Sequence, residues 1–172
     1  MLRTVMKTLI SVWMGLALLP IFAQAEVIRT CHLEGEFNLS SPTHFFCQGN
    51  SFTFTNVHIV TNGNALGISS DGLLTLEGLA IHAFPENVSG DPRDAAVVEL
   101  QAETITGQLT ITNDGFKAGS GGEIVLRALT FKDFHKPTLS ANGVGGGLNA
   151  GIFVETNSGQ IPLSVLIEHA ID

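Results

Sequence analysis

The sequence predicts an all-β protein whose short strands stack into a solenoid. Three observations lead to this fold class. Most segments after residue 50 alternate apolar and polar residues with a period of two, which is typical of strands and not of helices. Turn residues, mainly Gly, Asn and Asp, separate these segments. Similar segments recur about every 20 to 30 residues along the chain. Strand-rich repeats of that length indicate coils stacked on a common core.

Composition limits the class of protein. The chain has 172 residues, of which 44% are hydrophobic and 14% are charged, and its formal net charge is −8. This hydrophobic content excludes an intrinsically disordered chain, which combines low hydrophobicity with high charge. Lys and Arg together number 8 against 16 Asp and Glu, which excludes a nucleic-acid binder that depends on a basic surface.

The segment 1–25 has the pattern of a secretory signal peptide. Arg3 and Lys7 precede an apolar run from Leu9 to Leu19, and the small-residue motif Ala23-Gln24-Ala25 follows. The apolar run is shorter than the roughly 20 residues that a membrane-spanning helix needs. We therefore expect cleavage after Ala25, no membrane span after that cleavage, and an exported protein that is periplasmic, cell-surface or extracellular.

Two cysteines, Cys31 and Cys47, lie close to the predicted mature N-terminus. In an oxidising compartment an isolated pair is most simply one disulfide bond, and no C-x-x-C spacing supports a metal or redox site. The sequence therefore predicts a disulfide-stapled N-terminal cap over residues 26–50. The solenoid domain is expected over residues 51–172.

The predicted strands share a spacing of apolar residues. Each residue of the first apolar set recurs 22 positions later, and the same three-then-two spacing is found once more near residue 130. These sets are Phe54, Val57 and Ile59; Leu76, Leu79 and Ile81; and Leu126, Leu129 and Phe131. The sequence predicts that Val57, Leu79 and Leu129 form one interior column. A polar insertion at residues 85–94 accounts for the longer step from Leu79 to Leu109.

The segments Phe54-Thr-Asn-Val57-His-Ile59 and Leu76-Glu-Gly-Leu79-Ala-Ile81 resemble the coils of right-handed parallel β-helices. Such helices form pectate-lyase-like enzymes and, without catalysis, haemagglutinin-type adhesins. The resemblance implies a small right-handed parallel β-helix and leaves the function open, because one architecture carries many functions. The alternative is an antiparallel β-sandwich of the pilin type, which predicts alternation without a long-range repeat.

The acidic loop within residues 86–94 contains the candidate metal ligands. Oxygen ligands from Glu86, Asp91 and Asp94 suit Ca²⁺, which takes six to eight oxygens. The spacing is not that of an EF-hand, and we interpret the loop as a surface insertion between coils. Neither a Gly-x-Ser-x-Gly nucleophile motif nor a phosphate-binding loop occurs in the sequence, and no cofactor is expected.

These features favour an exported, non-enzymatic protein with a structural, adhesive or matrix-assembly role in the bacterial cell envelope. The expected partners are other copies of the chain or other envelope proteins, with polysaccharide as a further candidate. Two alternatives remain open at this point. One is a pilin-like fimbrial subunit, and the other is a small carbohydrate-active enzyme of the pectate-lyase type.

Overall fold

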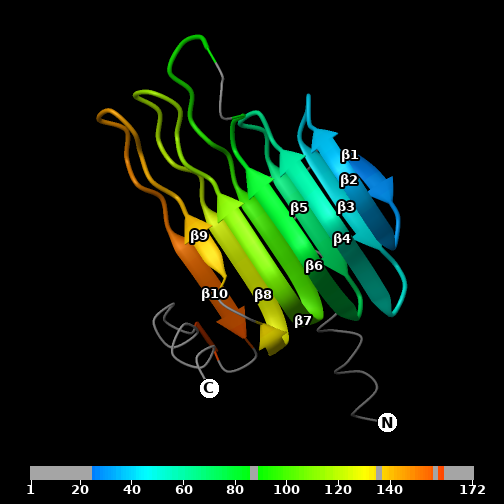
Figure 1. Ribbon diagram of the computed structural model, residues 1–172. Coiled ribbons are helices and arrows are strands. Elements are labelled where there is room, and N and C mark those ends of the chain that lie inside the picture. The colour runs from blue at the N-terminus through cyan, green and yellow to red at the C-terminus, as the bar shows by residue number, and fades with distance from the viewer. Residues whose placement is uncertain (1–24, 86–88, 135–136, 157–158, 161–172) are drawn as a thin grey trace.

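The computed structural model describes residues 25–85, 89–134, 137–156 and 159–160. This part of the chain contains strands and no helix, and the predicted signal peptide lies almost wholly outside it. The strands are β1 (Glu26–Arg29), β2 (His32–Asn38), β3 (Thr43–Cys47), β4 (Ser51–Val60), β5 (Leu66–Ser70), β6 (Leu73–His82), β7 (Val98–Thr112), β8 (Ile124–Phe134), β9 (Thr138–Ser140), β10 (Ile152–Thr156) and β11 (Gly159–Gln160). They are stacked from β1 and β2 at one end of the molecule to β9 and β10 at the other (Figure 1).

The strands form two walls. Wall A contains β1, β3, β5, the first parts of β7 and β8, and β10. Wall B contains β2, β4, β6, the second parts of β7 and β8, and β9. The chain passes from one wall to the other in each coil, and every pairing between these strands is parallel except that of β10 with β11. The molecule is therefore a parallel β-solenoid of about four turns, and not an antiparallel sandwich.

The repeat predicted from the sequence is the strand register of wall B. Phe54 pairs with Leu76, and Val57 pairs with Leu79. Leu79 then pairs with Leu109 across β6 and β7. The longer step between these two leucines is taken up by the connection between β6 and β7, whose described residues add no strand to either wall. The predicted insertion between coils is confirmed.

The predicted position of Leu129 is wrong. Leu126 lies in wall A, where it pairs with Leu100, and Phe131 pairs with Ile105 in wall B. Leu129 sits between these two pairs with 37% of its surface exposed, so Leu109 is the residue that continues the column of Val57 and Leu79. The spacing in β8 matched by coincidence, because this strand runs through both walls and turns the corner between them.

The segment predicted as a cap, residues 26–50, consists of strands that belong to the coils. β1 pairs in parallel with β3, and β2 pairs in parallel with β4. The predicted disulfide is confirmed, since Cys31 is bonded to Cys47 with their Cα atoms 4.8 Å apart. It links the turn between β1 and β2 to the end of β3, and therefore joins the first coil to the next.

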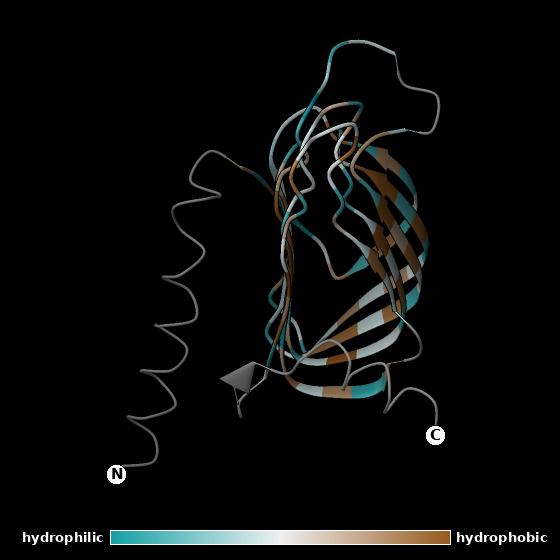
Figure 2. Ribbon diagram, turned by 90° about the vertical axis from the view of Figure 1, so that its left-hand side faces the viewer, coloured by the Kyte–Doolittle hydropathy of each residue, from teal (hydrophilic) through white to brown (hydrophobic). Residues whose placement is uncertain are grey.

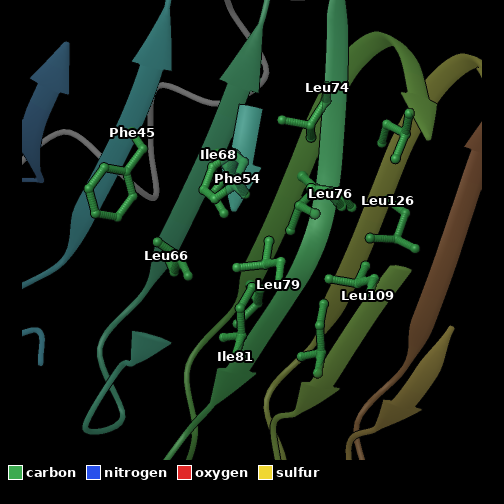
Figure 3. Close-up of a cluster of buried hydrophobic side chains, with 14 of the residues drawn as sticks. Phe45, Phe54, Leu66, Ile68, Leu74, Leu76, Leu79, Ile81, Leu109 and Leu126 are labelled. Carbon is green, nitrogen blue, oxygen red and sulfur yellow. The ribbon is translucent and has the colours of Figure 1, made fainter. Parts of the chain in front are cut away.

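The core lies between the two walls and is almost wholly apolar. Apolar and polar residues alternate along the strands (Figure 2), and alternate residues are buried, for example along β6. The largest fully buried side chains are Phe45, Phe52, Phe54, Ile59, Leu66, Ile68, Leu74, Leu76, Leu79, Ile81, Leu100 and Ile105. Many of them lie in one cluster that crosses several coils (Figure 3). Because similar rows repeat, each coil buries its apolar face against its neighbours.

Candidate functional site

Wall B bends where the same backbone irregularity recurs from coil to coil. A residue with a positive φ angle stands at this place in four successive strands: Gly35 (90°), Asn56 (50°), Gly78 (82°) and Gly107 (102°). Gly and Asn are the residues that tolerate this left-handed conformation at low cost. The strand register shifts at the bend in β2, β6 and β7, so the column is a stack of β-bulges.

The outer surface of this bend is hollowed into a groove of about 480 Å³. We call it the bend groove. Its lining comes from three successive strands, β4, β6 and β7, and consists of Thr55, Asn56, Leu76, Glu77, Gly78, Gly107 and Gln108. The groove therefore crosses the strands and follows the direction in which the coils are stacked.

Glycines allow neighbouring coils to approach closely at the bend groove. A Cβ atom at Gly107 would collide with the carbonyl oxygen of Leu76, and one at Gly78 would lie 3.3 Å from the Asn56 side-chain oxygen. Both glycines also have the left-handed φ that disfavours other residues. The backbone of neighbouring coils can thus approach closely at the bend groove.

The side chains around the bend groove are suited to hydrogen bonding with a neutral, hydroxyl-rich ligand. Glu77 is exposed and accepts a long hydrogen bond, 3.5 Å, from the Thr55 hydroxyl. Asn56 and Gln108 are exposed and offer amide groups that both donate and accept. Glu77 is the one charged residue in the lining, so the groove offers no cation for a phosphate or carboxylate.

Three long loops form a second candidate surface. They project from one side of the solenoid, beyond the ends of the strands (Figure 1). They follow β6, β7 and β9, and the described residues in them are 83–85, 89–97, 113–123 and 141–151 (Figure 1). We call them the loop stack. The Ser120 amide donates to Asp94 Oδ1 at 2.6 Å, and the Leu148 amide donates to Ser120 Oγ at 3.2 Å. Hydrogen bonds thus connect each loop to the next, and the stacking of the coils continues into the loops.

The predicted calcium ligands are not brought together. Glu86 lies outside the described residues, Asp91 is exposed, and the Asp94 carboxylate holds the Ser120 amide of the next loop. Across the described ranges, no three His, Cys, Asp or Glu side chains are grouped as metal ligands would be. Asp94 therefore has a structural contact that the sequence did not reveal.

Two cations and two aromatic rings also connect the first two loops. The Arg93 guanidinium lies 4.9 Å from the centre of the Phe84 ring and 5.7 Å from that of Phe116. Lys117 lies 5.3 Å from the Phe116 ring of its own loop, and its Nζ donates to the Gly90 carbonyl of the preceding loop. Such cation–π contacts contribute about 0.5 to 1 kcal/mol each at exposed sites. No pattern in the sequence predicts this cluster, because its members come from loops that belong to different coils.

Three charged side chains from neighbouring coils meet on the outer face of wall A. The Arg127 guanidinium contacts the Glu99 carboxylate, and its Nε lies 2.6 Å from Glu155 Oε2. Glu99 is only 4% exposed, although alternation places it on an outward position.

The same face contains a histidine whose pKa is lowered because burial disfavours its charged form. His44 Nε2 lies 2.8 Å from the Ser69 hydroxyl. In the unfolded chain this histidine binds a proton more readily, so stability falls as the pH falls through the ordinary histidine pKa of 6.5. We expect wild type to lose more stability than His44→Gln between about pH 7.5 and 5.5 in urea unfolding. Equal losses would contradict this assignment.

Comparisons with known proteins do not classify this chain. The chain matches no known family model, no curated protein and no solved structure. Within the described ranges, none of the secondary structure is a helix long and apolar enough to cross a membrane.

Proposed function

We propose that this protein is an exported, non-enzymatic structural and adhesive module of the bacterial cell envelope that holds a neutral polysaccharide in the bend groove. The observation that carries the proposal is the groove itself. It presents one carboxylate, two amides and a hydroxyl from three successive coils. Saccharide hydroxyl groups both donate and accept hydrogen bonds, and this set of groups can satisfy both roles.

The direction of the groove supports a polymeric ligand. Neighbouring strands lie about 4.8 Å apart, so three coils present polar groups over about 10 Å. A chain lying along the groove would meet Asn56 on β4, Glu77 on β6 and Gln108 on β7 in turn. Repeated contacts of this kind favour a repeating ligand over a single small molecule.

The disulfide supports an exported location. Disulfide bonds persist in oxidising compartments and are rare in the cytosol, and Cys31 is bonded to Cys47. The predicted leader, residues 1–25, is consistent with the same compartment. Among the groove residues, Glu77 is the one carboxylate, whereas glycoside hydrolysis generally uses a pair. This composition favours holding a sugar chain over cleaving it.

Binding to defined polysaccharides tests the proposal. The exported protein would be run through native gels that contain dextran, curdlan or alginate, and mixtures of protein and polysaccharide would be assayed for new reducing ends and unsaturated sugars. We expect retardation by a neutral glucan and no released product. Loss of a hydrogen bond to a charged group costs about 1.5 to 3 kcal/mol, so Glu77→Ala should weaken retardation at least about tenfold.

Glu103→Ala is the matched control, because Glu103 is also an exposed carboxylate and lies outside the bend groove. This control should be retarded like wild type. Gln108→Ala should be weakened in the same direction as Glu77→Ala. Equal retardation of all four proteins, or no retardation in any gel, would contradict the proposed site. Released sugar products would contradict the non-enzymatic function.

A further inference from the structure

In the part of the chain that the structure describes, both ends of the solenoid leave strand edges without a neighbouring coil. Among the described residues, β1 pairs with β3 alone and β2 pairs with β4 alone. At the other end β9 pairs with β7, and the outer edge of β10 is covered by β11 at Glu155 and Thr156. The amide and carbonyl groups along such edges are available to pair with another chain.

The apolar core is also incompletely covered at these two ends. Six hydrophobic residues pack on the core while remaining partly exposed, and all of them lie in the coils or connections nearest to the ends. They are Ile28 and Phe37 at the β1 and β2 end, and Phe131, Leu139, Ala150 and Ile152 at the β9 and β10 end. Stacking on another coil would bury this surface, as it does for every internal coil.

The outer rows of wall A end in residues that suit one another. One row begins at Val27 and reaches Phe153 at the far end, and these residues are 53% and 36% exposed. The next outward row begins at Arg29 and ends at Glu155. Each end therefore offers one exposed apolar residue and one charged residue, and the charges at the two ends have opposite sign.

We infer that copies of this protein stack head to tail, with the β1 and β2 end of one copy placed on the β10 and β9 end of the next. Continuing the internal register would put Val27 beside Phe153, Ile28 beside Val154 and Arg29 beside Glu155. Arg127, Glu155 and Arg29 of the next copy would then stand in one row with alternating charge. In wall B, Phe37 would cover Leu139.

The two-residue pairing of β11 with β10 is the contact that this stacking replaces. β1 offers four residues for the same edge, and β2 simultaneously extends wall B. Because the two contacting ends differ, the interface is heterologous and each added copy exposes a new end, which produces an open filament. The bend groove contributes no residue to either end, so this inference is independent of the proposed ligand.

Charge exchange tests the inference on protein recovered after export. Arg29→Glu should repel Glu155 of the next copy, and Glu155→Arg should repel Arg29, so each variant alone should require at least about tenfold more protein to assemble. In an equimolar mixture, a stack in which the two variants alternate has opposite charges at every junction, so the mixture should assemble at lower concentrations than either variant alone. Sedimentation velocity over a concentration series and electron microscopy would measure the size and shape of the assemblies.

A pair of valine variants covers the case in which Glu155→Arg fails to fold after losing its contact with Arg127. Val27→Asp should suppress assembly, because Val27 lies in the interface. Val144→Asp is the matched control, since Val144 is also exposed, at 41%, but lies in the loop stack. A wild-type monomer at all concentrations, a closed dimer that does not grow, or equal effects of both valine variants would overturn the inference.

Discussion

Leu109→Ala is expected to lower the free energy of unfolding by about 2 to 5 kcal/mol, the range for removing a large buried aliphatic side chain. Leu109 is 2% exposed and pairs with Leu79 in the interior of wall B. The neighbouring coils are fixed by parallel hydrogen bonding and cannot close readily around the missing atoms. Urea unfolding followed by far-ultraviolet circular dichroism would measure the loss.

Leu129→Ala is the matched control for this substitution. It removes the same atoms from a residue that is 37% exposed at a corner between the walls, and we expect a loss below about 1 kcal/mol. The column predicted from the sequence alone would have made Leu129 as sensitive as Leu79. Equal losses for the two alanine variants would therefore contradict the register described here.

Arg127→Met is expected to lower the free energy of unfolding by roughly 3 kcal/mol, at the lower end of the range for breaking a buried ion pair. The substitution leaves the Glu99 carboxylate almost fully buried without its countercharge. The lower end applies because the Arg127 side chain is itself 34% exposed. Urea unfolding near neutral pH would measure the effect.

Two further variants separate the effect of the buried Glu99 charge from that of the partly exposed Glu155 ion pair. Adding Glu99→Gln to Arg127→Met should recover most of the lost stability, because a neutral amide is far less costly to bury than a carboxylate. Glu155→Gln should have a small effect, since the Glu155 side chain is 36% exposed and exposed ion pairs contribute little. A double variant as unstable as Arg127→Met alone would contradict this explanation.

The sequence was sufficient where coils follow one another without insertion. Phe54 and Leu76 are paired because β4 and β6 have the same length and the turns between them are short. Apolar periodicity then reports the register directly. It failed in β8, where one strand serves both walls and the corner at Leu129 interrupts the alternation. Periodicity alone contains no signal for which wall a strand belongs to.

The candidate sites were harder to predict, because they depend on how coils are stacked. Glu99 alternates with the buried Val98 and Leu100, and its own burial depends on contacts such as that with Arg127, which belongs to the next coil. The bend groove had one local signal. Asn56 and Gly78 stand at the same place in the repeat, and both favour left-handed backbone. The sequence did not predict that the outer side of this column forms a groove. Only the structure shows it.

The position of the disulfide determines where the solenoid can open. In a stack of coils with contacts between neighbours alone, local unfolding begins at an end and proceeds inward one coil at a time. The bond between Cys31 and Cys47 joins the first coil to the second, so the first coil cannot separate by simple fraying. Reversible opening is thereby directed to the β9 and β10 end. The amide hydrogens of the two ends would accordingly exchange with solvent at different rates, slower beside the bond and faster at the far end.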